Sequence, residues 1–516
     1  MAKLVDGIAM RMKTLTRRHQ QQDDGECDVI RRSDAATGAG GGGGAVPSNY
    51  STLTEEGEYS LDEAIDAIGF GCFQLKLTLF VGLCWMSDAM EIMILSILSP
   101  ALKCQWRIST VEEALLTVLV FVGQMFGASG WGKFSDKYGR KKSILMCAIY
   151  TVFYGFLSAF SPNFIWLLVM RTLVGIGVGG VPQAVTIFSE FLPTKYRFAV
   201  AFIQVFWSLG TSAIVLAAVF IMPAYGWRYL VLVAALPCLI FAVSCVWMPE
   251  STRYDIAIGN VDGARATLER ISRDNGKSLP PGRLALTSVQ DSSKRGQIRD
   301  LFKPEYRLST SLLWIIWVVT CFSYYGLVLM STELYKYADD CSSTVGTPGH
   351  SIHKDACALE CKELDQSDYL NLLWTSLAEF PGIILCLVLI EVVGRKKAIS
   401  LQLGIYVIFT FTLCFCLPTS LLTLFLFVAR GAVAGGFQAL YVYTPEIYAT
   451  EVRSIGLGTA CAAARIGAIV TPFIGQVMLE YSVVLAVCIY AVLALTAAIL
   501  ACFLPIETKG KQLGAR

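Results

Sequence analysis

The sequence carries little charge for its length. Only 16% of its 516 residues are Asp, Glu, Lys or Arg, whereas 55% are hydrophobic and the mean hydropathy is +0.57. A soluble globular domain carries about 25% charged residues, so this polar surface is too small to cover a water-soluble particle of such length. The composition excludes an ordinary soluble protein and indicates a membrane protein.

Histidine is also scarce, which limits metal chemistry. The three histidines, His19, His350 and His353, show no metal-ligand spacing with the 17 cysteines. Most cysteines fall inside apolar runs, where they are expected to pack as small hydrophobic residues. The chain also lacks a phosphate-binding loop and a nucleophile motif. We therefore expect no metal, no cofactor, no nucleic-acid partner and no enzymatic activity.

What the chain has instead is long apolar runs. A bilayer core about 30 Å thick requires roughly 20 apolar residues in a helix. Windows of that length give twelve candidate spans: 73–99, 112–132, 143–160, 164–188, 198–222, 228–248, 308–332, 368–390, 398–417, 421–444, 454–478 and 482–504. The predicted fold class is an all-α polytopic protein of the lipid bilayer with twelve transmembrane helices.

The distribution of basic residues predicts the orientation. Lys133–Lys142 and Gly394–Lys397 connect spans on one side, whereas the connections 161–163, 223–227 and 418–420 on the other side carry no Lys or Arg. Because cationic loops stay in the cytoplasm, we expect both termini there. The predicted organisation is a disordered tail 1–59, an interfacial helix 60–72, six-helix halves 73–248 and 308–505, cytoplasmic segments 249–307 and 506–516, and a lumenal or extracellular loop 333–367.

The interfacial helix has its own local pattern. Ser60 and Glu63 fit a capping box, and Leu61, Ile65 and Ile68 share one helical face. We expect this apolar face to rest on the membrane surface.

The halves are related by an internal duplication at an offset of 255 to 256 residues. Four short motifs recur in the same order, and each first copy is followed here by its second: 136–142 and 391–397, 179–180 and 435–436, 190–197 and 446–453, 249–253 and 505–509. Parallel repeats of this kind place a transport site between two halves.

These residues resemble the major facilitator superfamily from about residue 70 to 510. The run Gly132-Lys-Phe-Ser-Asp-Lys-Tyr-Gly-Arg-Lys141 is similar to the superfamily's loop signature between spans two and three. Residues 67–74, 87–92, 323–326, 379–382 and 504–510 are similar to the synaptic vesicle 2-related group, which is itself related to organic-ion transporters. The resemblance implies a monomeric transporter, in a secretory or synaptic vesicle membrane rather than the plasma membrane.

The repeated motifs supply a candidate cytoplasmic gate. Asp136 can accept a hydrogen bond from a helix N-terminus or from Arg140 in one conformer and release it in another. The alternative is that the cations only fix the topology of the loop. The candidate gate residues are Asp136, Gly139, Arg140, Glu190, Arg197, Glu391, Gly394, Arg395, Glu446 and Arg453.

Charged residues inside the spans supply a candidate pathway. An ionised group there costs about 3 kcal/mol unless it faces a cavity or a partner. The candidates are Asp88, Glu91, Arg171, Glu379, Arg430 and Arg465. They can form purely structural pairs, or carry substrate and protons. Asp88 and Glu91 share a helical face, so each should raise the pKa of the other, as a proton carrier requires.

Arg465 bears on the substrate. The resemblance implies an acidic residue at this place in organic cation transporters and a basic one in anion-transporting relatives. A fixed cation attracts carboxylates. We therefore expect alternating-access transport of a small organic solute, an anion or zwitterion, coupled to protons. The alternative is a transporter-like vesicle protein that mainly binds partners.

Four cysteines fall on the predicted lumenal side, where oxidation is possible. They are Cys104 after the first span and Cys341, Cys357 and Cys361 in the large loop. A bond from Cys104 to the loop and bonds within the loop both remain open.

Overall fold

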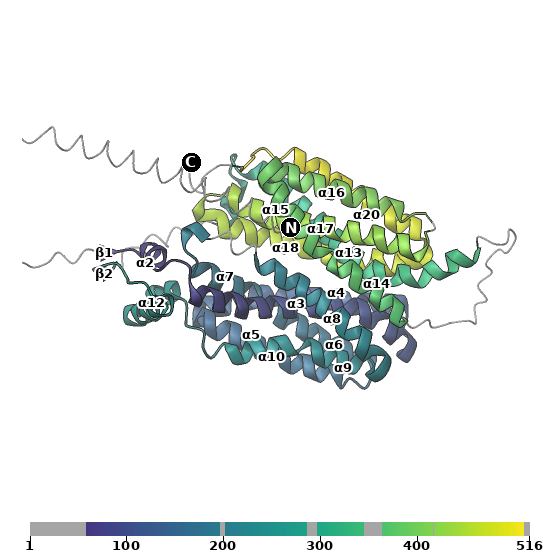
Figure 1. Ribbon diagram of the computed structural model, residues 1–516, viewed down its shortest axis with the longest axis horizontal. Coiled ribbons are helices and arrows are strands. Elements are labelled where there is room, and N and C mark those ends of the chain that lie inside the picture. Colours follow the sequence, from purple (N-terminus) through teal and green to yellow (C-terminus); the bar gives the residue numbers. More distant parts are fainter. Residues whose placement is uncertain (1–57, 197–201, 286–296, 345–363, 416, 510–516) are drawn as a thin grey trace, which may run out of the picture. The chain divides into compact units, whose positions relative to one another are not determined.

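The computed structural model describes residues 58–196, 202–285, 297–344, 364–415 and 417–509, and most of these are helical. The first half of the membrane region forms one group of packed helices (Figure 1), drawn from purple to teal. Its helices are α3 (Cys72–Trp106), α4 (Thr110–Tyr138), α5 (Arg140–Ala159), α6 (Phe164–Val178), α7 (Pro182–Glu190), α8 (Ile203–Tyr225), α9 (Trp227–Ala234) and α10 (Leu236–Ser244).

The second half forms a matching group, drawn from green to yellow in Figure 1. A 3-10 turn, η3 (Ile298–Phe302), precedes it. Its helices are α13 (Arg307–Thr344), α14 (Gln366–Leu377), α15 (Glu379–Val393), α16 (Arg395–Thr412), α17 (Thr419–Ile447), α18 (Thr450–Pro472), the π-helical η4 (Phe473–Met478), α19 (Leu479–Tyr481) and α20 (Val483–Cys502).

These helices make the predicted twelve-helix fold. Eleven continuous helical segments of the described chain are long and apolar enough to cross a membrane. Four of them join consecutive elements: α6 with α7, α9 with α10, α14 with α15, and the end of α18 with η4 and α19. The twelfth is α16, which begins with Arg395, Lys396 and Lys397 and packs between α17 and α20. Its three basic residues lie at one helix end, where a bilayer tolerates them.

Glycines allow close helix contacts at equivalent places in both halves. A Cβ atom on Gly127 of α4 would lie 2.1 Å from the carbonyl oxygen of Ile176 in α6. In the second half, a Cβ on Gly382 of α15 would lie 2.1 Å from the carbonyl oxygen of Gly431 in α17. Neither position accepts a side chain without moving backbone, so these glycines set the spacing of the helices.

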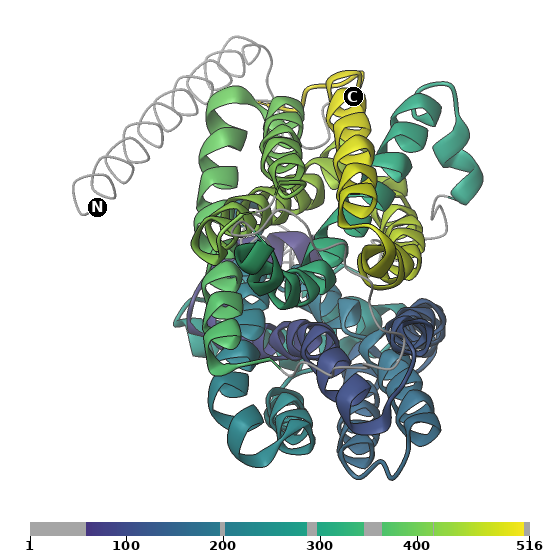
Figure 2. The same ribbon diagram turned by 90° about the vertical axis from the view of Figure 1, so that its right-hand side faces the viewer.

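The two halves meet where α4 packs against α18 and η4, α8 against α14 and α15, and α3 against α13. Figure 2, which views the molecule at 90° to Figure 1, keeps the two groups apart as separate layers. One apolar core extends through both, from Ile94 and Phe121 to Trp317 and Tyr443.

A small subdomain lies beside the membrane helices at the end that carries the repeated loop motifs, which we call the signature end. It consists of β1 (Glu58–Tyr59), α2 (Leu61–Ile68), α11 (Thr252–Ala257), α12 (Val261–Asn275) and β2 (Arg283–Leu284). β1 and β2 pair in parallel, and α2 packs against α12 (Figure 1). The predicted capping box is present, because Ser60 and Glu63 bond each other's backbone N–H groups. The apolar face of α2, predicted to rest on lipid, is instead buried with Leu268 and Ile271 of α12.

Asn275 at the end of α12 fastens this subdomain to α3. Its Oδ1 accepts from the backbone N–H of Phe73 at 3.0 Å, and its Nδ2 donates to Oε1 of Gln74 at 2.8 Å. Segment 249–307, predicted as a loop, is therefore largely structured where it is described.

Two predicted span ends need correction. α3 continues through Pro100 to Trp106, so Cys104 lies in its last turn rather than in a loop. Pro100 predicts a helix end because it lacks an N–H group, but flanking residues inside the bundle keep the helix intact. α13 likewise continues to Thr344, so the first residues of the predicted loop 333–367 are helical.

Candidate functional site

A cavity lies between the two halves. Residues of both halves line it, so its shape depends on how the halves pack against each other. The lining side chains are Trp85, Asp88, Gln204, Trp207, Trp317, Cys321, Tyr324, Tyr325, Ala434, Phe437, Tyr441, Cys461, Ala464 and Arg465.

Two opposite charges face this cavity. Asp88 comes from α3 in the first half and Arg465 from α18 in the second. Gln124 of α4 joins them: its Nε2 lies 3.5 Å from Oδ1 of Asp88, and its Oε1 accepts from Nη1 of Arg465. The side-chain amide therefore presents a donor to the acid and an acceptor to the base.

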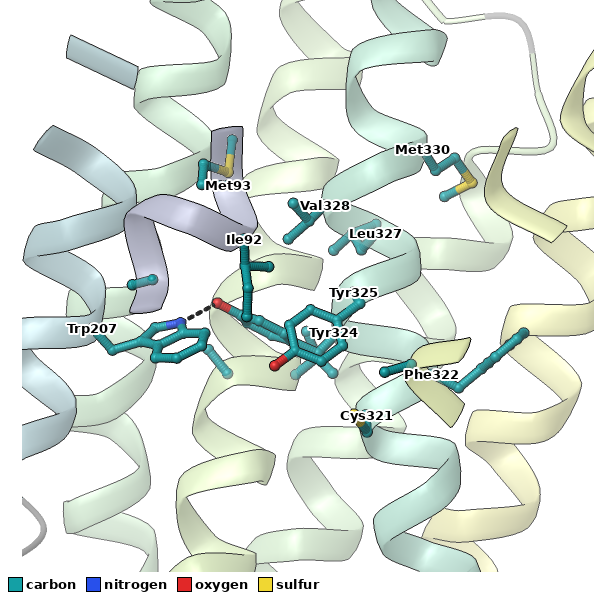
Figure 3. Packing of buried hydrophobic residues seen from close by; sticks show 14 of the residues in the cluster. Ile92, Met93, Trp207, Cys321, Phe322, Tyr324, Tyr325, Leu327, Val328 and Met330 are labelled. Carbon is teal, nitrogen blue, oxygen red and sulfur yellow. Dashed lines mark hydrogen bonds between the residues drawn. The ribbon is translucent and has the colours of Figure 1, made fainter. Parts of the chain in front are cut away.

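Aromatic rings form most of the remaining wall. Trp207 of α8 donates from Nε1 to the hydroxyl oxygen of Tyr324 in α13 at 2.7 Å, as Figure 3 shows. Tyr324 stacks edge-on against Tyr325, with ring centroids 5.3 Å apart. The Trp207–Tyr324 bond crosses between the halves, so a solute held against these rings contacts both halves at once.

Behind this wall lies a buried ion pair in the second half. Glu379, at the start of α15, bonds Nε and Nη2 of Arg430 in α17, each at 3.0 Å from Oε1. The same carboxylate accepts from Tyr324 Oη at 2.8 Å and from Ser208 Oγ of α8 at 3.1 Å. Thr211 of α8 lies 3.5 Å from it. Glu379 is therefore one of the points at which the second half is hydrogen-bonded to the first.

A second buried ion pair lies wholly within the first half. Nη1 of Arg171 in α6 bonds Oε2 of Glu91 in α3. Both side chains are at most 3% exposed. The pairing keeps each charge neutralised inside the bundle.

The structure thus divides the six charges predicted for the pathway. Four form the two buried pairs, Glu91 with Arg171 and Glu379 with Arg430, and two face the cavity. Glu91 lies one turn from Asp88, as predicted, but its carboxylate bonds Arg171. Asp88 is therefore the one acid of the two that lines the cavity.

The first signature cluster lies where α4 turns into α5. Arg140 bonds Asp136 with a 3.0 Å separation, and its Nε lies 3.8 Å from Oε1 of Glu190 at the end of α7. Glu190 also accepts from the hydroxyl of Ser251. The cluster ties three separate connections of the first half together.

The second signature cluster repeats this arrangement in the second half. Arg395 forms two hydrogen bonds to Glu446, at 3.1 and 3.2 Å, and its Nη1 lies 3.9 Å from Glu391. Glu446 also accepts from the hydroxyl of Thr508. Of the remaining predicted gate residues, Arg453 donates from Nε to the carbonyl oxygen of Pro445 at 3.0 Å, and Arg197 lies outside the described residues.

Gly139 and Gly394 complete the clusters through their backbone. Their φ angles are +103° and +93°, which only glycine adopts without strain. A Cβ atom at Gly139 would also lie 2.5 Å from a carboxylate oxygen of Glu250. Glycine at both positions allows the chain to turn sharply between two membrane helices.

Two glutamates of these clusters were missing from the predicted gate. Glu250 accepts from the backbone N–H of Lys141 at 3.0 Å, and Glu507 from that of Arg395 at 2.9 Å. Each carboxylate therefore caps the positive N-terminus of the helix that begins after the signature glycine, α5 for Glu250 and α16 for Glu507. The signal was available, because both residues lie in the repeated motif at 249–253 and 505–509.

At the end of the bundle away from the signature clusters, polar contacts join the halves. Nε2 of Gln476, in η4, donates to Ser99 of α3 at 2.9 Å and to Glu113 of α4 at 3.2 Å. Lys103 bonds Glu480 at 3.3 Å. These contacts hold the halves together from the cavity to this opposite end.

Cys104 also lies at the opposite end, and it is disulfide-bonded. The other described cysteines are free. The side chains of Cys341, Cys357 and Cys361 lie outside the described residues, so the choice of its partner remains a prediction.

Comparison with known proteins agrees with this arrangement. A Synaptic vesicle 2-related protein of Rattus norvegicus is 49% identical over 470 residues, which cover 91% of this chain and 84% of that protein. A Caenorhabditis elegans relative whose name describes a transporter is 46% identical over 468 residues, covering 90% of this chain and 89% of the relative.

Among solved structures, the xylose transporter XylE from E. coli, in a partially occluded inward open conformation, superposes with a TM-score of 0.65. It is 19% identical and covers 86% of this chain and 100% of that one. At this identity the likeness shows a shared fold.

The family described as Sugar (and other) transporter matches residues 43–347 and 365–515, which takes in both halves and their signature clusters. This chain therefore belongs to the sugar (and other) transporter family, a family of multi-pass membrane transporters within the major facilitator superfamily.

Proposed function

We propose that this protein is a secondary active transporter that moves a small organic anion or zwitterion by alternating access, coupled to protons. The observation that carries the proposal is the cavity between the halves, to which the first half contributes Asp88 and the second Arg465. A site shared in this way opens to one side or the other when the halves rock.

The contacts between the halves support a cycle of this kind. Gln476 and Glu480 hold the opposite end closed, and Glu379 joins the halves beside the cavity. Opening that end requires the loss of these bonds. The signature clusters then have to bring the halves together at their own end, which we assign to the cytoplasmic side because of its basic loops. The names of the relatives support a vesicle membrane as the location.

Asp88 is the acid best placed to carry the proton. It lines the cavity, whereas Glu91 is neutralised by Arg171 and Glu379 by Arg430. A carboxylate that faces a changing cavity meets water from each side in turn, so it can bind and release a proton once per cycle.

Arg465 supports the choice of substrate. Its guanidinium lines the cavity, and the lining contains no other cationic side chain among the described residues. A fixed cation in a partly dry site attracts a carboxylate and repels a simple organic cation.

Uptake into liposomes that contain the purified protein tests the proposal. Labelled organic anions, zwitterions, cations and sugars should be screened with and without an imposed pH gradient. We expect saturable uptake of at least one anion or zwitterion, accelerated by the gradient and lost in Arg465→Gln. Absence of uptake in the whole panel, with correct folding, would favour a protein that mainly binds partners.

A further inference from the structure

We infer that the cavity selects a zwitterion with an aromatic body, whose ammonium and carboxylate groups are as close together as in an α-amino acid. This inference rests on the proposed function and narrows its substrate class. It starts from three observations on the cavity: its charge balance, the spacing of its two charges and the composition of its wall.

The first observation is that the charges of the lining balance. Asp88 and Arg465 are the two charged side chains that line it within the described chain. The ion pairs behind it, Glu91 with Arg171 and Glu379 with Arg430, are also neutral together. Entry of a simple anion or cation leaves one uncompensated charge in a desolvated site, which is unfavourable. A zwitterion leaves the total at zero and offers each wall charge a partner.

The second observation concerns the distance between the charges. The side-chain amide of Gln124 spans Asp88 and Arg465, with its nitrogen toward the acid and its oxygen toward the base. The nitrogen and oxygen of an amide are about 2.2 Å apart, given its bond lengths. The ammonium nitrogen and carboxylate oxygens of an α-amino acid have a similar short separation. Such a group can bond both residues at once, whereas a long, flexible zwitterion has to fold back on itself.

The third observation is the aromatic wall. Trp85, Trp207, Trp317, Tyr324, Tyr325, Phe437 and Tyr441 line the same cavity. Hydroxyls and amides suited to a sugar are few, since the oxygen of Tyr324 is already bonded to Trp207 and Glu379. A planar apolar body gains area burial and ring contacts against this wall.

Three aromatic probes that differ mainly in charge test the inference, together with one neutral sugar. They are phenylalanine as the zwitterion, phenethylamine as the cation, 3-phenylpropionate as the anion and glucose as a neutral sugar. Binding should be measured on the full-length protein in lipid nanodiscs, by intrinsic tryptophan fluorescence and by thermal stabilisation. The three tryptophans in the cavity wall report occupancy without requiring transport. We expect phenylalanine to bind at least about tenfold more tightly than each other probe, since each lost charge removes a charge-assisted hydrogen bond.

Variants of Asp88 and Arg465 test which side chain binds the ammonium group of the zwitterion and which binds its carboxylate. In Asp88→Asn, 3-phenylpropionate should bind more tightly than phenylalanine, and in Arg465→Gln phenethylamine should bind more tightly than phenylalanine, because in each case the single-charge probe now balances the lining. Arg265→Gln, which removes an exposed pair on α12, is the matched control and should behave like the wild type. The comparison of probes on the wild type remains decisive if a cavity variant fails to fold.

The outcomes separate this inference from the proposed function. Tighter binding of glucose or of either single-charge probe to the wild type, or no binding of any probe, would overturn the inference. The transport proposal would still stand if the liposome panel shows gradient-driven uptake of another solute. Phenylalanine binding without any uptake in liposomes would support the inference and contradict transport.

Discussion

The signature clusters are duplicated in the two halves, whereas the charged residues of the central cavity are not. The clusters occur twice: Arg140 with Glu190 and Arg395 with Glu446 lie at equivalent places in the two halves. The cavity charges occur once each. The helix equivalent to α18 in the first half is α8, which carries no charged residue, and the position 256 residues before Arg465 is Leu209.

This difference indicates that the clusters serve the movement of the halves and that the cavity charges serve recognition of the solute. Two halves that rock against each other need the same fastening in each half, so a duplicated cluster is suited to the conformational change. A solute with no internal symmetry needs different partners on its two sides. The unrepeated Asp88 and Arg465 are suited to recognise such a solute.

The largest loss of stability is expected at the buried ion pair of Glu379 and Arg430 beside the cavity. Glu379→Ala leaves the charge of Arg430 buried without its partner, and should lower the stability of the folded protein by about 3–5 kcal/mol. Thermal unfolding in detergent, checked for reversibility, measures the change. The double variant Glu379→Met with Arg430→Met is the control and should recover most of the loss. A fully additive loss in the double variant would contradict the ion pair.

A smaller change in free energy is expected in the signature clusters. It should be largest for their more buried acids, which we call the inner acids. Glu446 and Glu190 are 17% and 12% exposed, whereas Glu391 and Asp136 are 76% and 53% exposed. Because Glu446 forms two hydrogen bonds with Arg395, Glu446→Gln should change the balance of open and closed states by about 1–3 kcal/mol. Cysteine labelling from each side of the membrane measures this balance.

The outer acids are the matched comparison for that experiment. Asp136→Ala and Glu391→Ala should also shift the balance between the two states, but by less than about 1 kcal/mol, as is usual for exposed pairs. Equal shifts from inner and outer acids would contradict the assigned geometry.

How well the sequence predicts a contact depends on how far apart along the chain its two residues lie. Gly139, Arg140 and Glu190 could be predicted because they recur in the second half. The ion pairs could be predicted only as a set of charges. Glu91 and Arg171 are 80 residues apart, and helix rotation within the bundle decides which charges meet. Gln124 was missed because a single buried amide in an apolar helix carries no pattern.

The subdomain at the signature end was missed for a different reason. Asn260 caps α12, and Ala264, Leu268 and Ile271 follow at helical spacing. This pattern predicts an amphipathic helix, and the apolar face of α2 is its complement. Each face alone resembles a membrane-surface helix, and only their packing shows that they cover each other.

Substitution of Asp88 should change the pH dependence of transport while the stability of the folded protein changes little. Asp88→Asn keeps the shape of the side chain, so we expect uptake to continue without dependence on a pH gradient. Glu91→Gln is the comparison and should destabilise the protein because it leaves Arg171 without a charged partner. The assignment is wrong if Asp88→Asn, Glu91→Gln and the double variant all respond normally to the gradient.

The smallest change in stability is expected at the end of the bundle opposite the signature clusters. Lys103 and Glu480 are 25% and 40% exposed, so Lys103→Gln should change stability by about 0.2–1 kcal/mol. Urea or thermal unfolding of the variant and the wild type gives this value. A loss above about 2 kcal/mol would mean that the pair is far better shielded from water than its exposure indicates.

The most direct test of alternating access uses a native cysteine. Cys461 lines the cavity, and it can be kept as the reactive thiol after replacement of the other free cysteines. A membrane-impermeant thiol reagent should then be applied from one side of oriented liposomes at a time. We predict labelling from both sides, with the ratio shifted by Glu446→Gln. Labelling from one side alone, unchanged in that variant, would contradict a cavity that opens alternately.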